Sequence, residues 1–121
     1  MARAEPRDKA GLTRAQRDTL RARLDRARRA AIAELKEGET AARAAENEPE
    51  PMDAAELARE QGDGALLIAR ARAQLQEIDA ALERMRAGTY GVSERSGDPI
   101  GYERLEAVPW ARLGADESEG R

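Results

Sequence analysis

Residues 47–55 read NEPEPMDAA, and this stretch decides the fold because helical patterns lie on both sides of it. Pro49 and Pro51 stand two residues apart, which a regular helix interior does not accept, since each proline removes a backbone donor and crowds the preceding turn. Residues that precede a proline are held in extended geometry. Asp53 then stands where a helix N-cap belongs, with Glu56 three residues later. The stretch predicts a turn between two helices.

Upstream of the turn, the pattern predicts a helix that follows Thr13 and runs to about Asn47. Thr13 fits an N-cap, and Gln16 three positions later completes a capping box. Apolar residues spaced by three and four form one seam along this helix: Leu20, Leu24, Ala27, Ala31 and Leu35. Gly38 lies inside the helix, where glycine costs roughly 1 kcal/mol relative to alanine, so a softer helix is expected there.

Downstream of the turn, a second helix is predicted from about Ala54 to Ala87, with Gly88 as its C-cap. Its seam alternates spacings of three and four: Ile68, Ala71, Leu75, Ile78, Leu82 and Met85. Gly62 and Gly64 are expected to weaken the end nearest the turn. Neither seam is wide enough to be stable alone, so the two helices are expected to fold back on each other as a hairpin roughly 50 Å long.

The predicted fold is therefore mainly all-α, with a long antiparallel coiled-coil hairpin over residues 12–87 and its tip at 47–55. Residues 1–11 are expected to be a flexible lead. Residues 88–121 differ in composition and are predicted to form a small lobe with a short helix and a polar tail. The lobe holds all three aromatic residues of the chain, and its expected core is Tyr90, Ile100, Tyr102, Leu105 and Trp110.

Composition excludes several classes of protein. Charged residues make up 37% of the chain and aromatic residues 2%, which suits long helices better than a thick core or a sheet. The net charge of -3 disfavours sequence-specific binding of nucleic acid. The absence of Cys and His excludes thiol or imidazole catalysis and ordinary zinc sites. No apolar run of membrane-spanning length and no apolar leader is seen, so a soluble cytoplasmic protein is expected.

Residues 88–109 read GTYGVSERSGDPIGYERLEAVP and resemble the C-terminal signature of the DksA/TraR family of DnaK-suppressor-like proteins. The pattern G-T-[YF]-G, then G-x-P-I-G, then E-R-L-E-A-x-P is long and specific. The hairpin before it is similar to the family's coiled coil in length and position. The tip is similar as well, because Glu50, Asp53 and Ala55 match the family's D-x-x-D-x-A turn with Glu in place of the first Asp.

The family's lobe usually carries a zinc site of four cysteines. The corresponding positions here are Ser93, Ser96, Gly114 and Glu117. Two hydroxyls, a glycine and one carboxylate do not form a zinc site. The resemblance therefore implies a degenerate zinc-finger-like lobe without metal. Structural zinc contributes roughly 10 kcal/mol or more in small modules, so this lobe needs another source of stability.

The resemblance implies a regulator that inserts its coiled coil into the secondary channel of bacterial RNA polymerase and alters the stability of promoter open complexes. The residues carried over are Glu50 and Asp53 as functional acids, Ala55 as their small neighbour, and Asn47 as a polar contact. In some members a basic cluster also helps to bind the alarmone ppGpp. Those basic positions are Glu77, Val108 and Ser118 here, which predicts weak or absent dependence on ppGpp.

Other functions remain open at this stage. An enzyme is not expected, because the tip carboxylates lie on an exposed turn without a pocket to tune them. The chain is expected to be monomeric. An alternative is a coiled-coil adaptor unrelated to polymerase, which an exposed apolar stripe on the outside of the hairpin would favour. The arginine-rich start of the first helix is expected to be a solvated face or a contact to acidic patches of the polymerase, rather than a nucleic-acid site.

Overall fold

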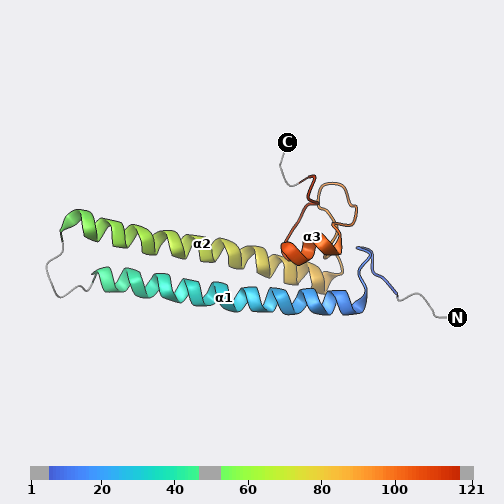
Figure 1. Ribbon diagram of the computed structural model, residues 1–121, viewed down its shortest axis with the longest axis horizontal. Helices are drawn as coiled ribbons and strands as arrows, with labels where there is room; N and C mark the ends of the chain where they lie inside the picture. The colour runs from blue at the N-terminus through green and yellow to red at the C-terminus, as the bar shows by residue number, and fades with distance from the viewer. Residues whose placement is uncertain (1–5, 47–52, 118–121) are drawn as a thin grey trace. The chain divides into compact units, whose positions relative to one another are not determined.

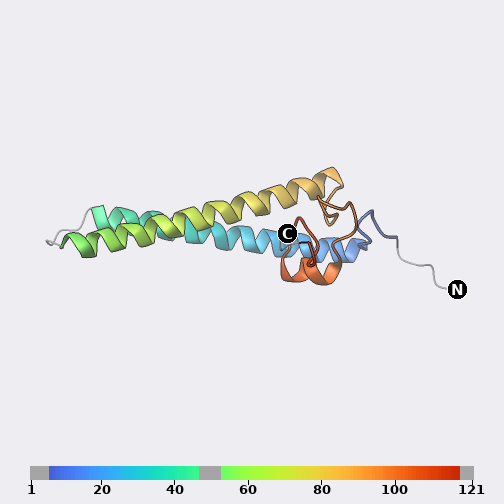
Figure 2. The same ribbon diagram turned by 90° about the horizontal axis from the view of Figure 1, so that it is seen from above.

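The computed structural model describes residues 6–46 and 53–117 and contains three helices (Figure 1). The two long helices are α1 (Arg14–Glu46) and α2 (Ala54–Ala87), and the short α3 spans Tyr102–Ala107. α1 and α2 pack side by side as an antiparallel hairpin (Figures 1 and 2). Within the described ranges, β structure is limited to two isolated bridges, Arg7 with Thr13 and Val92 with Pro99. The predicted helical hairpin with a small lobe and one short helix is confirmed.

The start of α1 is fixed by the capping box that the sequence predicted. The Thr13 backbone N–H donates to Gln16 Oε1 at 2.9 Å, and the Gln16 backbone N–H donates to Thr13 Oγ1 at 3.1 Å. These two bonds satisfy donors that lack partners in the first turn of a helix. α1 ends at Glu46, one residue before the predicted end at Asn47, and Asn47 lies outside the described residues.

Both ends of α2 are also set by local chemistry. The Asp53 carboxylate accepts a hydrogen bond from the Glu56 backbone N–H at 2.8 Å, which is the predicted N-cap. At the other end Gly88 has φ 83°, and its N–H donates to the Met85 carbonyl while the Thr89 N–H donates to the Arg84 carbonyl at 2.9 Å. This pair of bonds is a Schellman C-cap, which needs the left-handed backbone that glycine adopts freely.

The structure divides into two compact units, residues 28–76 and residues 1–27 with 77–121. In the first unit, α1 and α2 meet through small residues: Ala31, Gly38, Ala45, Gly64 and Ala71 are all buried. A Cβ built on Gly38 would lie 2.9 Å from Ile68 Cγ1, and one built on Gly64 would lie 3.3 Å from the Ala42 backbone nitrogen. The sequence treated these two glycines as weak points, whereas they are the places where the helix backbones come closest.

The second unit combines the first part of α1, the last part of α2 and the lobe. Its largest fully buried side chains are Leu12, Leu20, Leu24, Ile78 and Leu105. Residues 6–11, which the sequence placed in a flexible lead, form a turn in which the Asp8 carboxylate accepts hydrogen bonds from the Ala10 and Leu12 backbone N–H groups. The division of the chain at residues 12 and 88 remains a sequence prediction, since the lobe shares one compact unit with parts of both long helices.

Candidate functional site

The described part of the hairpin tip is the start of α2. Asp53 and Ala55 are both exposed, and the Asp53 carboxylate lies at the helix N-terminus, where the helix dipole favours a negative charge. The carboxylate also caps the helix through the Glu56 N–H, so the backbone bond fixes its position. Asn47 and Glu50, the other two residues predicted for this site, lie outside the described residues.

A second cluster lies in the lobe, at the positions where the resemblance predicts lost zinc ligands. Ser93 is buried, and its Oγ accepts hydrogen bonds from the Arg95 and Ser96 backbone N–H groups at 3.1 and 3.2 Å. The Gly97 N–H donates to the Ser93 carbonyl at 3.0 Å and closes the turn. The Ser93 hydroxyl therefore holds the turn at residues 93–97 through local side-chain-to-backbone hydrogen bonds.

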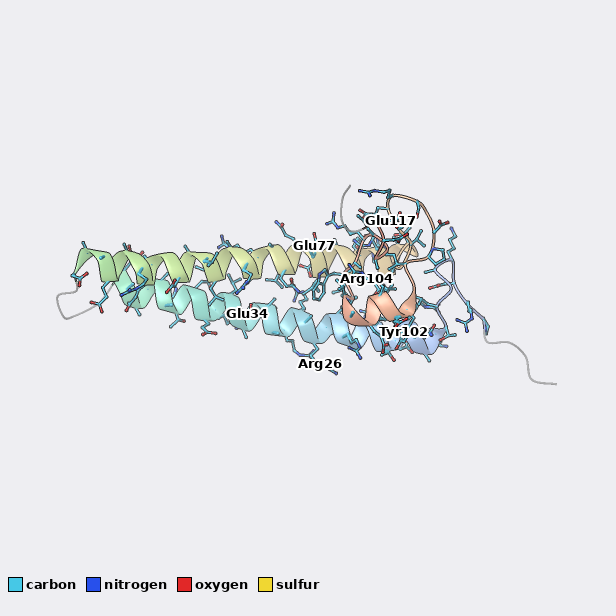
Figure 3. The ribbon with its side chains drawn as sticks, turned by 45° about the horizontal axis from the view of Figure 1, so that its top comes forward. Arg26, Glu34, Glu77, Tyr102, Arg104 and Glu117 are labelled. Carbon is cyan, nitrogen blue, oxygen red and sulfur yellow. The ribbon has the colours of Figure 1, made fainter. Side chains whose placement is uncertain are left out.

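Glu117 connects this loop to a second turn, which spans residues 114–117. Its Oε1 accepts a hydrogen bond from the Gly114 backbone N–H at 2.9 Å, and the Glu117 N–H donates to the Gly114 carbonyl at 3.0 Å. The Gly114 hydrogen bond, followed by hydrogen bonds from the Ser93 and Ser96 side chains, lowers the pKa of the Glu117 carboxyl. All four predicted positions thus come together around one carboxylate, which Figure 3 shows within the lobe.

This donor set does not fit zinc. Gly114 has no side chain to donate, Ser93 Oγ already accepts two backbone hydrogen bonds, and a Glu117 oxygen is engaged by a backbone N–H. A structural zinc site instead has four ligands in almost every case, supplied by thiolate, imidazole or carboxylate groups. Across residues 6–46 and 53–117, no group of three or more His, Cys, Asp or Glu side chains is arranged to hold a metal ion.

The apolar part of the lobe is centred on Tyr90 and Leu105, which are 4% and 0% exposed. The Tyr90 hydroxyl donates a hydrogen bond to the Pro109 carbonyl at 2.8 Å, and burial raises the pKa of this phenol. Ile100, Tyr102 and Trp110 are half-buried at its edge. Ala10 and Leu12 are also buried in this core, which the sequence did not indicate. A Cβ built on Gly91 would lie 2.8 Å from the Ala10 side chain and 3.3 Å from the Leu12 side chain.

An ion pair joins the lobe to α2. Arg112 Nη2 lies 3.0 Å from Glu77 Oε1, and Arg84 Nη2 donates to the Trp110 carbonyl at 3.3 Å. Burial lowers the pKa of Arg84, and the nearby carboxylates of Glu94 and Glu77 oppose that shift. Glu77 is one of the three positions that the resemblance predicts to be basic in ppGpp-responsive members, and here it is an acidic residue paired with Arg112. Val108 is half-buried, and Ser118 lies outside the described residues.

Among the described helices, none combines the length and the apolar character that crossing a membrane requires. The structure defines a class of protein: a two-helix hairpin with an acidic N-cap at the start of its second helix, and a small lobe whose loops meet at the Glu117 carboxylate.

The transcription factor DksA2 from Pseudomonas aeruginosa has the same fold as this chain. The two share 32% sequence identity with a TM-score of 0.81, over 93% of this chain and 88% of that one. The chain therefore belongs to the DksA/TraR family, as the sequence predicted. DksA2 is a transcription factor rather than an enzyme, in agreement with the expectation that this chain is not an enzyme.

Curated relatives match over shorter stretches. General stress protein 16O of Bacillus subtilis is 57% identical over 42 residues, which are 35% of this chain and 26% of that protein. The RNA polymerase-binding transcription factor DksA of Caulobacter vibrioides is 40% identical over 70 residues, 55% of this chain and 49% of that protein. The chain thus spans about a quarter to a half of the length of these relatives. No family model matches the sequence.

Proposed function

We propose that this chain is a transcription regulator that binds bacterial RNA polymerase through its secondary channel and changes the stability of promoter open complexes. The observation that carries the proposal is the exposed Asp53 carboxylate at the start of α2, next to Ala55, in a chain of the DksA/TraR fold. The Caulobacter relative supports it, because that protein is named for binding RNA polymerase. Glu50, Asp53, Ala55 and Asn47 are the proposed contacts.

Charge supports the direction in which the hairpin enters its partner. Residues 34–63 hold ten acidic and three basic residues, a net charge of -7, whereas the whole chain carries -3. The part of the hairpin nearest the tip is therefore far more acidic than the rest. Such an acidic segment is attracted to a positively charged channel in its partner. Its carboxylates repel the phosphates of nucleic acid. An acidic tip of this kind acts on the polymerase and not on DNA directly.

We further propose that ppGpp has little effect on this regulator. Glu77 places a carboxylate where a phosphate-binding cation stands in responsive members, and Arg112 is committed to that carboxylate at 3.0 Å. A ligand with several phosphates would have to displace this pair and approach a negative charge. Val108 offers no charge, and Ser118 has none in the sequence.

The lobe is proposed to keep its fold without zinc. The Glu117 carboxylate, the Ser93 hydroxyl and the buried Tyr90 supply contacts that the metal supplies in a four-cysteine lobe. Since the chain has no thiol, neither zinc shortage nor oxidation of a ligand removes these contacts.

A second candidate function is an adaptor that binds other proteins and is unrelated to polymerase. One observation favours it: the solvent side of α2 carries a stripe of exposed, uncharged residues, which are Ala58, Gly62, Leu66 and Ala69. The same stripe is compatible with polymerase binding, so the choice between the two functions depends on whether the chain binds polymerase at all.

The deciding experiment is co-purification with core RNA polymerase, followed by transcription from a sensitive promoter. The test variant is Glu50→Asn/Asp53→Asn. Asparagine caps a helix about as well as aspartate, so this variant removes tip charge while it keeps the cap of α2. We expect retained binding and loss of the promoter effect. If the wild-type chain fails to bind polymerase, the proposed function is wrong.

A further inference from the structure

The segment that leads into α1 has a defined structure although it belongs to no helix. Arg7 and Thr13 form an isolated antiparallel bridge, and the Asp8 backbone N–H donates to the Leu12 carbonyl at 3.0 Å. These contacts fold the segment back on itself, as the hydrogen bonds of a tight turn do. We name residues 7–13 the clasp.

The Asp8 side chain holds the turn of the clasp together. Its Oδ1 accepts hydrogen bonds from the Ala10 and Leu12 backbone N–H groups at 3.0 and 2.9 Å, and its Oδ2 lies 3.1 Å from Arg17 Nη1 on α1. Arg17 Nη1 also donates to the Leu12 carbonyl at 3.2 Å. A carboxylate that accepts several donors stabilises a turn through charge-assisted bonds. The shape of the clasp therefore depends on Asp8.

The clasp contacts the lobe at Gly91. Ala10 and Leu12 are 4% and 1% exposed. A Cβ built on Gly91 would lie 2.8 Å from Ala10 Cβ, 3.3 Å from Leu12 Cδ1 and 3.4 Å from Leu105 Cδ1. The Gly91 carbonyl accepts a hydrogen bond from the Ile100 N–H at 2.8 Å. Gly91 thus joins the clasp to the loop that returns at Ile100, and the contact is too close for any side chain at this position.

Ion pairs between the lobe and the long helices are weaker than this apolar contact. Arg112 pairs with Glu77 of α2 at 3.0 Å, and Arg23 of α1 pairs with Glu106 at 3.7 Å. The four side chains are between 39% and 44% exposed, and such pairs add little to stability. Burial of the Leu12 side chain contributes more than either pair. The clasp is therefore a major attachment of the lobe.

We infer that the clasp is a conformational switch of the lobe. When it is closed, it holds the loop between Gly91 and Ile100 against the start of α1. When it opens, that loop is released while the hairpin stays folded, because Ala31 and Ala71, which join α1 to α2, belong to the other compact unit. Segments held by few buried contacts open at a lower free energy than the whole protein unfolds. The inference goes beyond the proposed function, since it concerns the lobe and not the binding of polymerase.

The test is amide hydrogen exchange of the full chain, with the Ile100 N–H as reporter. Gly91→Ala is compared with Gly97→Ala: φ is 84° and 79°, so alanine strains both backbones alike, but a Cβ on Gly97 meets nothing within 4 Å. Overpacking against the clasp is expected to raise the exchange rate of Ile100 about tenfold relative to the control. Ala10→Gly, added to Gly91→Ala, removes the nearest methyl group and is expected to reverse part of this increase. Exchange in residues 28–46 is expected to stay unchanged.

A second set of variants acts from the clasp and leaves the lobe sequence intact. Asp8→Ala removes the acceptor of two backbone N–H groups and is expected to raise the exchange rate of Ile100 about fivefold or more. Asp8→Asn keeps an oxygen that accepts these bonds and is expected to have a smaller effect. Asp18→Ala is the matched control, an exposed acid of α1 in the same compact unit, and is expected to exchange like the wild-type chain.

Faster exchange that is confined to the lobe in both Gly91→Ala and Asp8→Ala supports the switch. The inference is wrong if either variant leaves Ile100 at the rate of its control, because the clasp then does not hold the loop. It is also wrong if exchange rises equally in residues 28–46, because the clasp then opens only when the whole protein unfolds. Binding of the wild-type chain to polymerase is a separate measurement, so failure of the switch and failure of the proposed function are distinguishable.

Discussion

Gly38 and Gly64 face each other across the hairpin, and each approaches the backbone of the other. A Cβ on Gly38 would lie 3.2 Å from the Gly64 carbonyl oxygen, and a Cβ on Gly64 would lie 3.3 Å from the Gly38 carbonyl oxygen. The helices are therefore closer here than side chains of ordinary size permit. Close-packed interiors do not absorb an added methyl group without displacement of their neighbours.

Alanine at either glycine is expected to destabilise the hairpin. The helix gains about 1 kcal/mol in propensity, and overpacking costs about 1–3 kcal/mol, so the free energy of unfolding falls by up to about 2 kcal/mol. Gly62→Ala provides the matched control, since open space surrounds that position and the variant is expected to gain about 1 kcal/mol. Urea unfolding followed by circular dichroism separates the three variants. Equal stabilisation by all three would contradict the close packing.

The close contact between Gly38 and Gly64 could not be predicted from the sequence. Thr13, Gln16, Asp53 and Gly88 act within one turn of their own helix, so the ends of α1 and α2 were predicted to within one residue. The partner of Gly38 lies on another helix. Sequence spacing does not identify such a neighbour, and glycine was therefore interpreted by its intrinsic propensity alone.

The candidate site was predictable to a similar degree. From the resemblance, the sequence predicts that Ser93, Ser96, Gly114 and Glu117 stand at former zinc-ligand positions, and this stays a prediction. It did not indicate that the Glu117 carboxylate would join the two loops, because its bonds to the Ser93 and Ser96 side chains connect residues more than 20 positions apart. The tip acid Asp53 was identified correctly as an N-cap from local sequence, whereas Glu50 lies outside the described residues.

Glu117 is expected to make the lobe sensitive to acid. Hydrogen bonds from the Gly114 N–H and the two serine hydroxyls lower the pKa of its carboxyl, so the folded state binds the proton less tightly than the unfolded state does. The stabilisation is therefore complete above the unfolded-state pKa and is lost as the pH falls through the lower folded-state value. Trp110 fluorescence reports the lobe across this range.

Glu117→Gln is the variant that isolates this effect. Glu83 also has a lowered pKa, because Arg86 hydrogen-bonds to it, and it contributes acid sensitivity of the same sign on α2. Glu117→Gln is expected to lower the stability of the lobe near neutral pH and to flatten its dependence on acid, with the contribution of Glu83 unchanged. An identical acid profile for the wild-type chain and the variant would exclude Glu117 as the connecting group.

The Tyr90 hydroxyl is expected to contribute measurably to the lobe. Tyr90→Phe removes the donor to the Pro109 carbonyl and leaves that buried acceptor without its partner, which costs about 1–3 kcal/mol. Tyr102→Phe is the control, since Tyr102 is half-buried. The readout is the free energy of unfolding from urea titrations. Equal stability of the two variants would show that the 2.8 Å bond does not stabilise the lobe.

Removal of metal is expected to change nothing. Where the resemblance predicts cysteines, the lobe has two hydroxyls, a glycine and the Glu117 carboxylate, which already accepts a backbone hydrogen bond. A strong chelator is therefore expected to find no structural metal ion to remove. The melting temperature and the promoter effect should be the same with chelator, without it and with added zinc. In cells, the regulator is expected to support growth under zinc limitation. A drop in melting temperature after chelation would reveal a metal that the donor set does not predict.

The Glu77–Arg112 pair leads to the expectation for ppGpp. Both side chains are partly exposed, so the 3.0 Å pair contributes at most about 1 kcal/mol to stability, and its main effect is electrostatic. A carboxylate at Glu77 repels a phosphate, and Arg112 is already neutralised by that carboxylate. Promoter effects should therefore be comparable with and without ppGpp in transcription assays with purified polymerase. Glu77→Lys removes the repelling charge and frees Arg112, and it is expected to introduce a ppGpp response. Strong enhancement by ppGpp in the wild-type chain would show that other groups bind the alarmone.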